Sequence, residues 1–192
     1  ISIEEYDEAQ KKLEESENFE NKLFAFPAQS NVSGVKHDLG WIKKAQDLGW
    51  DVLLDAAAFV PTNQLDLKEV KPDFVCVSFY KIFGYPTGIG CLLVNKEKFK
   101  KLQKPWFAGG TVSLVSVNAI HHFLINNHER FEDGTLNYLD IPAVKIGLDY
   151  IENIGIQRIN ERVASLRKYL FENLESLQHD NGRKLIQIFG PK

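Results

Sequence analysis

The stretch Asp73–Asn95, DFVCVSFYKIFGYPTGIGCLLVN, decides the fold of this chain. It contains two apolar runs, 74–79 and 91–94, and the first is rich in β-branched and aromatic residues. Runs of this kind predict strands that are buried on both faces. Lys81 lies between them, where an unpaired ammonium group would be costly. A chemical role explains it, because a lysine held away from water can form a Schiff base with a carbonyl group.

Three glycines and a proline follow this lysine: Gly84, Pro86, Gly88 and Gly90. Glycine has no Cβ, so the backbone at these positions could approach a bulky ligand closely. The segment between the two predicted strands therefore combines a reactive amine with room for a ligand.

The sequence before this stretch predicts parallel βαβ units. Apolar runs at 23–27 and 51–57 predict strands, the apolar positions of 38–48 share one helical face, and 65–70 predicts a short helix or turn. Strands that alternate with helices indicate an α/β fold with right-handed crossovers. Because the loops after parallel strands gather at one edge of the sheet, Asn31, Asp55 and Lys81 are expected to converge there.

Composition excludes several classes of protein. The chain has 192 residues, 44% of them hydrophobic, and a net charge of −3 with acidic and basic residues mixed, which does not indicate a nucleic-acid or membrane surface. No apolar run reaches transmembrane length, and there is no secretory pattern at the start. The two cysteines, Cys76 and Cys91, lie inside predicted strands, which favours a reducing, cytoplasmic compartment and a structural role for both.

The second half of the chain changes character. Residues 96–104 form a basic run that predicts a solvated helix face, 117–125 and 141–151 predict helices, and 156–177 predicts a long helix with apolar residues at intervals of three and four. A new strand is expected at 185–189. His121 and His122 have no partner at metal-ligand spacing, so no metal site is expected. A domain boundary is expected between about 140 and 155 on this change of pattern.

The chain contains no methionine, and its last residues read as a strand that has only begun. We therefore expect an internal fragment of a longer protein.

The converging residues suggest one kind of chemistry. Enzymes that use pyridoxal 5′-phosphate (PLP) need a lysine for the aldehyde and an acid beside the pyridine nitrogen. Asp55 precedes Lys81 by 26 residues, which is one parallel-strand unit. A purely structural reading stays open at this point: Lys81 could extend its ammonium from a strand end into water, and Asp55 could cap a helix.

A family resemblance adds to this reading. SFYKIFGYPTGIG at 78–90 closely resembles the lysine segment of class V aminotransferase-like enzymes, and in particular their molybdenum cofactor sulfurase branch. LFAFPAQSNVSG, LLDAAAFVPT, WFAGGTVS and FEDGT are similar to the same branch, in the same order. The resemblance implies a fold-type I PLP-dependent transferase, with a mostly parallel sheet and flanking helices. Residues 1–145 would belong to the large PLP-binding domain, and 146–192 to a long helix and the start of a smaller α+β subdomain.

The resemblance also assigns site residues. Lys81 would be the Schiff-base lysine and Asp55 the partner of the pyridinium nitrogen. Asn31 would contact the phenolic oxygen of the cofactor, and Ser78 its phosphate. Tyr80 stands where many desulfurases have histidine.

Two further positions complete this assignment. Thr111 falls where, in dimeric relatives, the neighbouring subunit reaches a cofactor phosphate, which implies a homodimer. Ala58 stands where typical desulfurases have glutamine; this departure and that at Tyr80 are in keeping with the sulfurase branch.

The implied activity is sulfur transfer from L-cysteine to the molybdenum cofactor, which activates xanthine dehydrogenase and aldehyde oxidase. A cysteine thiolate would accept the sulfur as a persulfide and leave alanine. In the family pattern this cysteine would lie beyond Lys192 and the ring-stacking histidine before Ile1, so the fragment alone should be inactive. Two alternatives remain: a general cysteine desulfurase or selenocysteine lyase of the same fold, and a non-catalytic remnant of that fold.

Overall fold

The computed structural model describes residues 3–15 and 19–189. Along the chain the elements are α1 (Ile3–Glu15), β1 (Leu23–Pro27), α2 (Gly40–Asp47), β2 (Asp51–Asp55), β3 (Phe74–Ser78), α3 (Phe79–Phe83), β4 (Gly90–Val94), η1 (Phe99–Lys101), β5 (Val112–Val115), β6 (His122–Leu124), η2 (His128–Phe131), α4 (Ile141–Ile154) and α5 (Ile156–Ser176). Strands form at all four segments where they were expected, 23–27, 51–57, 74–79 and 91–94. The expectation that 91–94 is buried on both faces is wrong, because Leu92 and Leu93 are 49% and 44% exposed on the edge strand β4.

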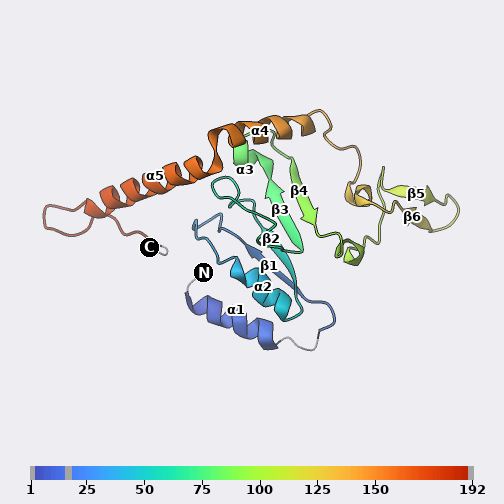
Figure 1. Ribbon diagram of the computed structural model, residues 1–192, viewed down its shortest axis with the longest axis horizontal. Coiled ribbons are helices and arrows are strands. Elements are labelled where there is room, and N and C mark those ends of the chain that lie inside the picture. The colour runs from blue at the N-terminus through green and yellow to red at the C-terminus, as the bar shows by residue number, and fades with distance from the viewer. Residues whose placement is uncertain (1–2, 16–18, 190–192) are drawn as a thin grey trace.

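A four-stranded sheet in the order β1-β2-β3-β4 forms the centre of the molecule (Figure 1). β1, β2 and β3 are parallel, and β4 pairs antiparallel with β3 at the edge. The register places Pro27 opposite Asp55 and Asp55 opposite Cys76. β1 and β2 therefore end opposite each other, and β3 continues beyond them to Ser78. The carboxyl ends of all three parallel strands lie at one edge of the sheet, as the sequence predicts for βαβ units.

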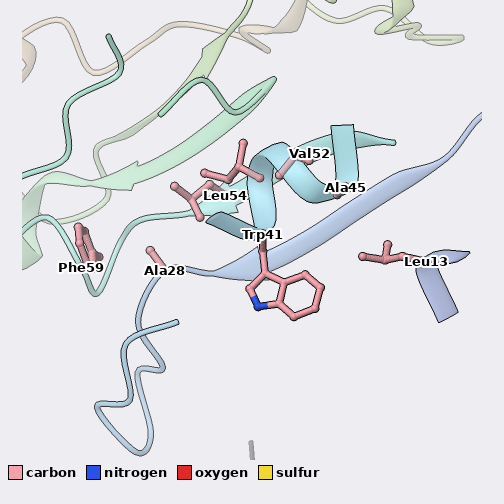
Figure 2. Close-up of a cluster of buried hydrophobic side chains, with 8 residues drawn as sticks. Leu13, Ala28, Trp41, Ala45, Val52, Leu54 and Phe59 are labelled. Atoms are coloured by element: carbon pink, nitrogen blue, oxygen red, sulfur yellow. The ribbon is translucent and has the colours of Figure 1, made fainter. Parts of the chain in front are cut away.

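The core lies between the sheet and the two amino-terminal helices (Figure 2). Leu13 comes from α1, Trp41 and Ala45 from α2, and Val52 and Leu54 from β2. Val52, Leu54 and Ala45 are completely buried. Their burial removes apolar surface from water and fixes the first two strands against α2.

The amino-terminal end of β2 carries a cluster of charges. Lys98 and Lys101 each contact a different oxygen of Asp51 at 2.6 Å. Burial alone would raise the pKa of Asp51, but hydrogen bonds from Lys101 and Lys98 outweigh it and hold that pKa below its usual value. Lys98 also lies 3.5 Å from Asp73.

This cluster corrects the expectation of a solvated basic helix at 96–104. Only the short η1 forms there, and the side chain of Lys104 is 4% exposed, paired with Asp133. Lys98, Lys101 and Lys104 pair with carboxylates from distant parts of the chain, which a local charge pattern cannot reveal.

Two other expectations for the second half are also wrong. Residues 117–125 do not form a helix, because Ser116 and His121 close a hairpin between β5 and β6 through a backbone hydrogen bond of 3.0 Å. Over so few residues, apolar spacing fits two short strands as well as a helix. Residues 185–189 form no strand, since this segment finds no strand to pair with in the part of the chain that the structure describes. The long helix is confirmed as α5.

The domain boundary at 145/146 stays a prediction. α4 runs without interruption through this position, and the chain bends at Gly155, where α4 ends and α5 begins. In Figure 1, α4 lies across the end of the sheet near α3, whereas α5 and the β5–β6 hairpin extend away on opposite sides.

A substitution at Asp73 tests how the strands of the core are held in place. It is 2% exposed and accepts hydrogen bonds from the Val52 backbone N–H at 2.8 Å and the Gln46 amide at 3.1 Å. Asp73→Ala should lower the free energy of unfolding by about 2 kcal/mol, because it leaves a buried strand N–H without its acceptor. Asp47→Ala is the control, since it removes only an exposed pair with Lys43 and should cost less than about 1 kcal/mol. Urea unfolding followed by tryptophan fluorescence measures both; equal losses would contradict the proposed role of Asp73.

Candidate active site

The candidate site lies at the carboxyl edge of the parallel strands. Asp55 is the last residue of β2 and Ser78 the last residue of β3, while Asn31 lies in the loop after β1. Lys81 lies on the single turn of α3, directly after β3. The structure thus brings these four residues to one edge, which the strand order predicted for Asn31, Asp55 and Lys81.

Lys81 and Asn31 are in direct contact. The Lys81 ammonium donates a hydrogen bond of 2.9 Å to Asn31 Oδ1, across 50 residues of sequence. Lys81 is half-buried on α3, so the expectation that it sits between two buried strands is corrected: a helical turn lifts it out of the sheet. The amine is consequently both positioned by a partner and open to a ligand.

The loop that carries Asn31 is held by its own backbone. Ser30 N–H donates to the Val35 carbonyl at 2.8 Å, and Gly34 N–H donates to the Ser30 carbonyl at 3.0 Å. Gly34 has φ of 72°, a left-handed conformation that favours glycine. These bonds fold the loop back on itself, and Asn31 directly follows the residue that makes both of them.

Asp55 is exposed at the end of its strand. Its Oδ1 accepts a hydrogen bond of 2.9 Å from the Ala57 N–H, which fixes the carboxylate at the start of the following turn. Within the described residues, no hydrogen bond or ion pair joins Asp55 to Lys81, whose partner is Asn31. The acid and the amine therefore stand at the same edge but apart, as groups that contact different parts of one ligand would be.

The backbone conformation of the turn after Lys81 explains why the turn contains glycines. Gly84 caps α3 with φ of 83°, and Gly88 has φ of 78°. No atom lies within 4 Å of where a Cβ on either glycine would be, so this side of the turn is open. Gly90 has a different reason: a Cβ there would lie 2.7 Å from the Val77 carbonyl oxygen, so the close pairing of β3 with β4 requires glycine.

The other expected site residues, Ser78, Tyr80 and Thr111, differ in how exposed they are and where they lie. Ser78 is half-buried at the amino-terminal end of α3, and Tyr80 is 43% exposed on that turn. Thr111 is completely buried, and its hydroxyl contacts the Ala108 N–H at 2.9 Å and the Ala108 carbonyl at 2.8 Å. It precedes β5, on the side of the molecule away from α3 (Figure 1). Within one copy of this chain, Thr111 does not join the other site residues.

A buried amide network lies beside the site and was missed by sequence reasoning. Asn63, 8% exposed, donates to Gln29 Oε1 at 3.2 Å and accepts from Asn160 Nδ2 at 3.0 Å. Asn160 also donates to the Thr62 carbonyl at 2.8 Å. The network ties α5 to the loop after Asp55 and to the start of the Asn31 loop. Its hydrogen bonds join residues up to 98 positions apart in the sequence, and no local pattern marks them.

Both cysteines lie beside the site without the properties of a nucleophile. Burial, followed by the charge of Asp55, raises the pKa of Cys76, and burial raises the pKa of Cys91. A raised pKa lowers the fraction of thiolate at neutral pH, and only the thiolate attacks. This supports the structural role that the sequence suggested for both.

The donor set fits a pyridoxal-type cofactor. An amine, an amide, a carboxylate and a hydroxyl come from consecutive strand ends, and the open face of the glycine turn gives room beside them.

Among the residues that the structure describes there is no group of three His, Cys, Asp or Glu side chains that could hold a metal ion. No helix there is long and apolar enough to cross a membrane.

Comparisons with known proteins agree with this geometry. The family model for class-V aminotransferases matches residues 3–184. The chain is 44% identical over 181 residues to molybdenum cofactor sulfurase of Bos taurus, covering 87% of this chain and 20% of that protein. It is 39% identical over 193 residues to molybdenum cofactor sulfurase 1 of Aedes aegypti, covering 92% of this chain and 25% of that protein. The chain thus spans only a fifth to a quarter of these curated relatives.

Solved structures show the same fold. An apo structure of a cysteine desulfurase from Thermococcus onnurineus NA1 aligns with a TM-score of 0.77 and 34% identity, over 88% of this chain and 40% of that chain. The expected fold-type I architecture, with a mostly parallel sheet and helices, is therefore confirmed, as is the resemblance to the sulfurase branch.

The raised thiol pKa values give a direct test. Alkylation of Cys76 and Cys91 by iodoacetamide at pH 8 should be slower than that of free cysteine, because burial keeps both thiols protonated. The rate should rise with a midpoint above pH about 8.5, the usual thiol value. Peptide mass spectrometry follows each cysteine separately. Labelling of either one as fast as free cysteine would mean that it is available as a nucleophile.

Proposed function

Because the chain belongs to the class-V aminotransferase family, we propose that it supplies the PLP-binding part of an enzyme that removes sulfur from L-cysteine and delivers it to the molybdenum cofactor. The observation that carries this proposal is the contact between the Lys81 ammonium and Asn31 at the strand edge that also holds Asp55. Identity of about 40% with molybdenum cofactor sulfurases supports the choice of sulfur acceptor.

Each residue has a role that follows from its side chain. Lys81 would hold the aldehyde of the cofactor through Nζ, and its amine would move a proton at the substrate α-carbon. Asn31 orients Lys81 and contacts the cofactor hydroxyl. Asp55 holds a proton at the pyridine nitrogen, since a carboxylate stabilises a neighbouring cation. Ser78 donates to the phosphate, and Tyr80 offers a hydroxyl beside it.

The cofactor, when bound, supplies an electron sink for the substrate carbon. In the overall reaction, one sulfur atom passes from the cysteine substrate to a thiolate of the protein. The carbon–sulfur bond of cysteine breaks and a sulfur–sulfur bond forms to a protein thiolate; that thiolate is oxidised to a persulfide while the substrate carbon is reduced and leaves as alanine. The raised pKa values of Cys76 and Cys91 argue against either as the acceptor thiolate.

The partners follow from the same proposal. L-cysteine is the sulfur donor, the molybdenum cofactor is the acceptor, and molybdenum hydroxylases such as xanthine dehydrogenase and aldehyde oxidase receive the sulfurated cofactor. Thr111 lies away from Lys81 in the same copy, so its contact with a cofactor phosphate requires a homodimer. Its hydroxyl would have to exchange its bond to Ala108 for this contact.

A general cysteine desulfurase is the second candidate, favoured by the 34% identity with the cysteine desulfurase of known structure. The two functions differ in the final acceptor alone. The sulfurase restores the activity of a molybdenum hydroxylase that lacks its terminal sulfur, whereas a general desulfurase releases sulfide or loads other acceptors.

Alanine formation from L-cysteine tests the proposed site. With the complete gene product and added PLP, Lys81→Ala should abolish turnover, and Asp55→Ala should reduce it by at least about 100-fold because a protonating group at the ring nitrogen is lost. Asp66→Ala is the matched control: this exposed carboxylate also follows β2 but only accepts from the Lys68 N–H. Wild-type turnover in Lys81→Ala or Asp55→Ala would contradict the assignment of that residue.

A further inference from the structure

Gly147 occupies the middle of α4, where glycine is a poor helix former. A Cβ at this position would lie less than 3.0 Å from three atoms of the Phe83 ring, Cγ, Cδ2 and Cε2. The ring cannot yield easily, because it stacks on Phe79 with centroids 6.3 Å apart and planes 24° apart. The absence of a side chain at Gly147 therefore lets α4 pack directly on Phe83.

Phe83 belongs to the same helical turn as Lys81. α3 spans Phe79–Phe83 and ends at the left-handed Gly84, so the lysine and the ring that contacts α4 are two residues apart on one helical turn. Any displacement of Phe83 by a larger residue at 147 shifts this turn relative to the sheet, and with it the Lys81 amine that reaches Asn31.

A second contact holds the same turn against the same helix. The Tyr85 hydroxyl donates a hydrogen bond of 2.9 Å to Asp140 Oδ1, and Asp140 is the residue directly before α4. Asp140 and Gly147 are about two helical turns apart. α4 thus contacts the lysine turn at two separate points, one through a hydrogen bond and one through close packing.

We propose that Gly147 is a positioning residue for Lys81: it sets the distance between α4 and α3 and thereby the placement of the amine opposite Asn31. This rests on the proposed function, in which Lys81 attaches PLP. α4 then acts as a brace for the attachment point, although it contributes no residue to the cofactor contacts.

Gly147→Ala separates this proposal from simple helix propensity, because the two predict opposite effects. Alanine favours helix over glycine, so propensity alone predicts a more stable α4 and an unchanged site. The packing argument predicts a lower melting temperature and a displaced Lys81. Phe83→Ala in the Gly147→Ala background removes all three of the ring atoms that would clash and should return Lys81 to its wild-type placement.

The experiment measures attachment rather than turnover. The complete gene product, freed of cofactor, is incubated with increasing PLP, reduced with borohydride and digested, and the labelled fraction of Lys81 is read by mass spectrometry. Gly147→Ala should raise the PLP concentration for half-labelling by about tenfold or more, since small misplacements of a reacting group are costly. The double variant should return to within about threefold of wild type. Lys145→Ala, on the solvent side of α4, is the matched control and should behave as wild type.

Several outcomes would overturn the proposal. One is a Gly147→Ala protein that is folded by circular dichroism and labels Lys81 like wild type, even if it melts earlier, because Gly147 would then serve packing alone. Another is a double variant that folds but does not recover labelling. If Gly147→Ala alone fails to fold, the double variant tests the proposal. The proposal requires that this variant folds and that its Lys81 is labelled by PLP.

The test also distinguishes failure of the proposed function. If wild-type protein takes up no PLP at Lys81, the function proposal fails, and tryptic cleavage after Lys81 then decides the geometry. Gly147→Ala should be cleaved faster than wild type because the lysine turn is loosened, and the double variant should be cleaved at the wild-type rate. Equal cleavage rates for wild type, Gly147→Ala and the double variant would refute the proposed role of α4 in holding the lysine turn.

Discussion

The parallel pairing of β1, β2 and β3 is the constraint on which the rest of the structure depends. Its register aligns Pro27, Asp55 and Cys76, so the chain leaves all three strands at the same edge of the sheet. The loop with Asn31, the carboxylate of Asp55 and the turn with Lys81 are consequences of this alignment. A slip in one strand would separate the Lys81 amine from Asn31, whereas the core contacts of α2 with β2 resist such a slip.

The strand ends alone do not hold the site in place. The turn with Lys81 is contacted by α4 through Phe83 and Tyr85, and the loop after Asp55 is contacted by α5 through Asn160. Asn63 extends the second contact to Gln29, near the Asn31 loop. The two carboxyl-terminal helices therefore support the lysine, the acid and the amide loop from one side. Such support matters for catalysis because reacting groups must be held within a fraction of an ångström.

The sequence predicted well whatever depends on local pattern. Apolar runs located the four strands of the sheet, and the order of strands and helices predicted that Asn31 and Lys81 would meet. It predicted poorly what depends on contacts between distant segments. Lys104 looked solvated because its partner, Asp133, lies 29 residues away in the sequence. Residues 117–125 looked helical, although they form the turn and second strand of a hairpin, because apolar spacing over so few residues is ambiguous. Gly147 and Asn63 carried no local signal, since their importance comes only from Phe83 and Asn160.

The central claim is that Lys81 is the attachment point of PLP, and visible absorbance of the complete gene product tests it most directly. After reconstitution with PLP, wild-type protein should show a visible band that shifts when L-cysteine is added. In Lys81→Ala that band should be missing, while the far-ultraviolet circular dichroism stays that of the folded protein. The same band in Lys81→Ala, responding to L-cysteine as in wild type, would show that the cofactor is attached elsewhere and would contradict the account.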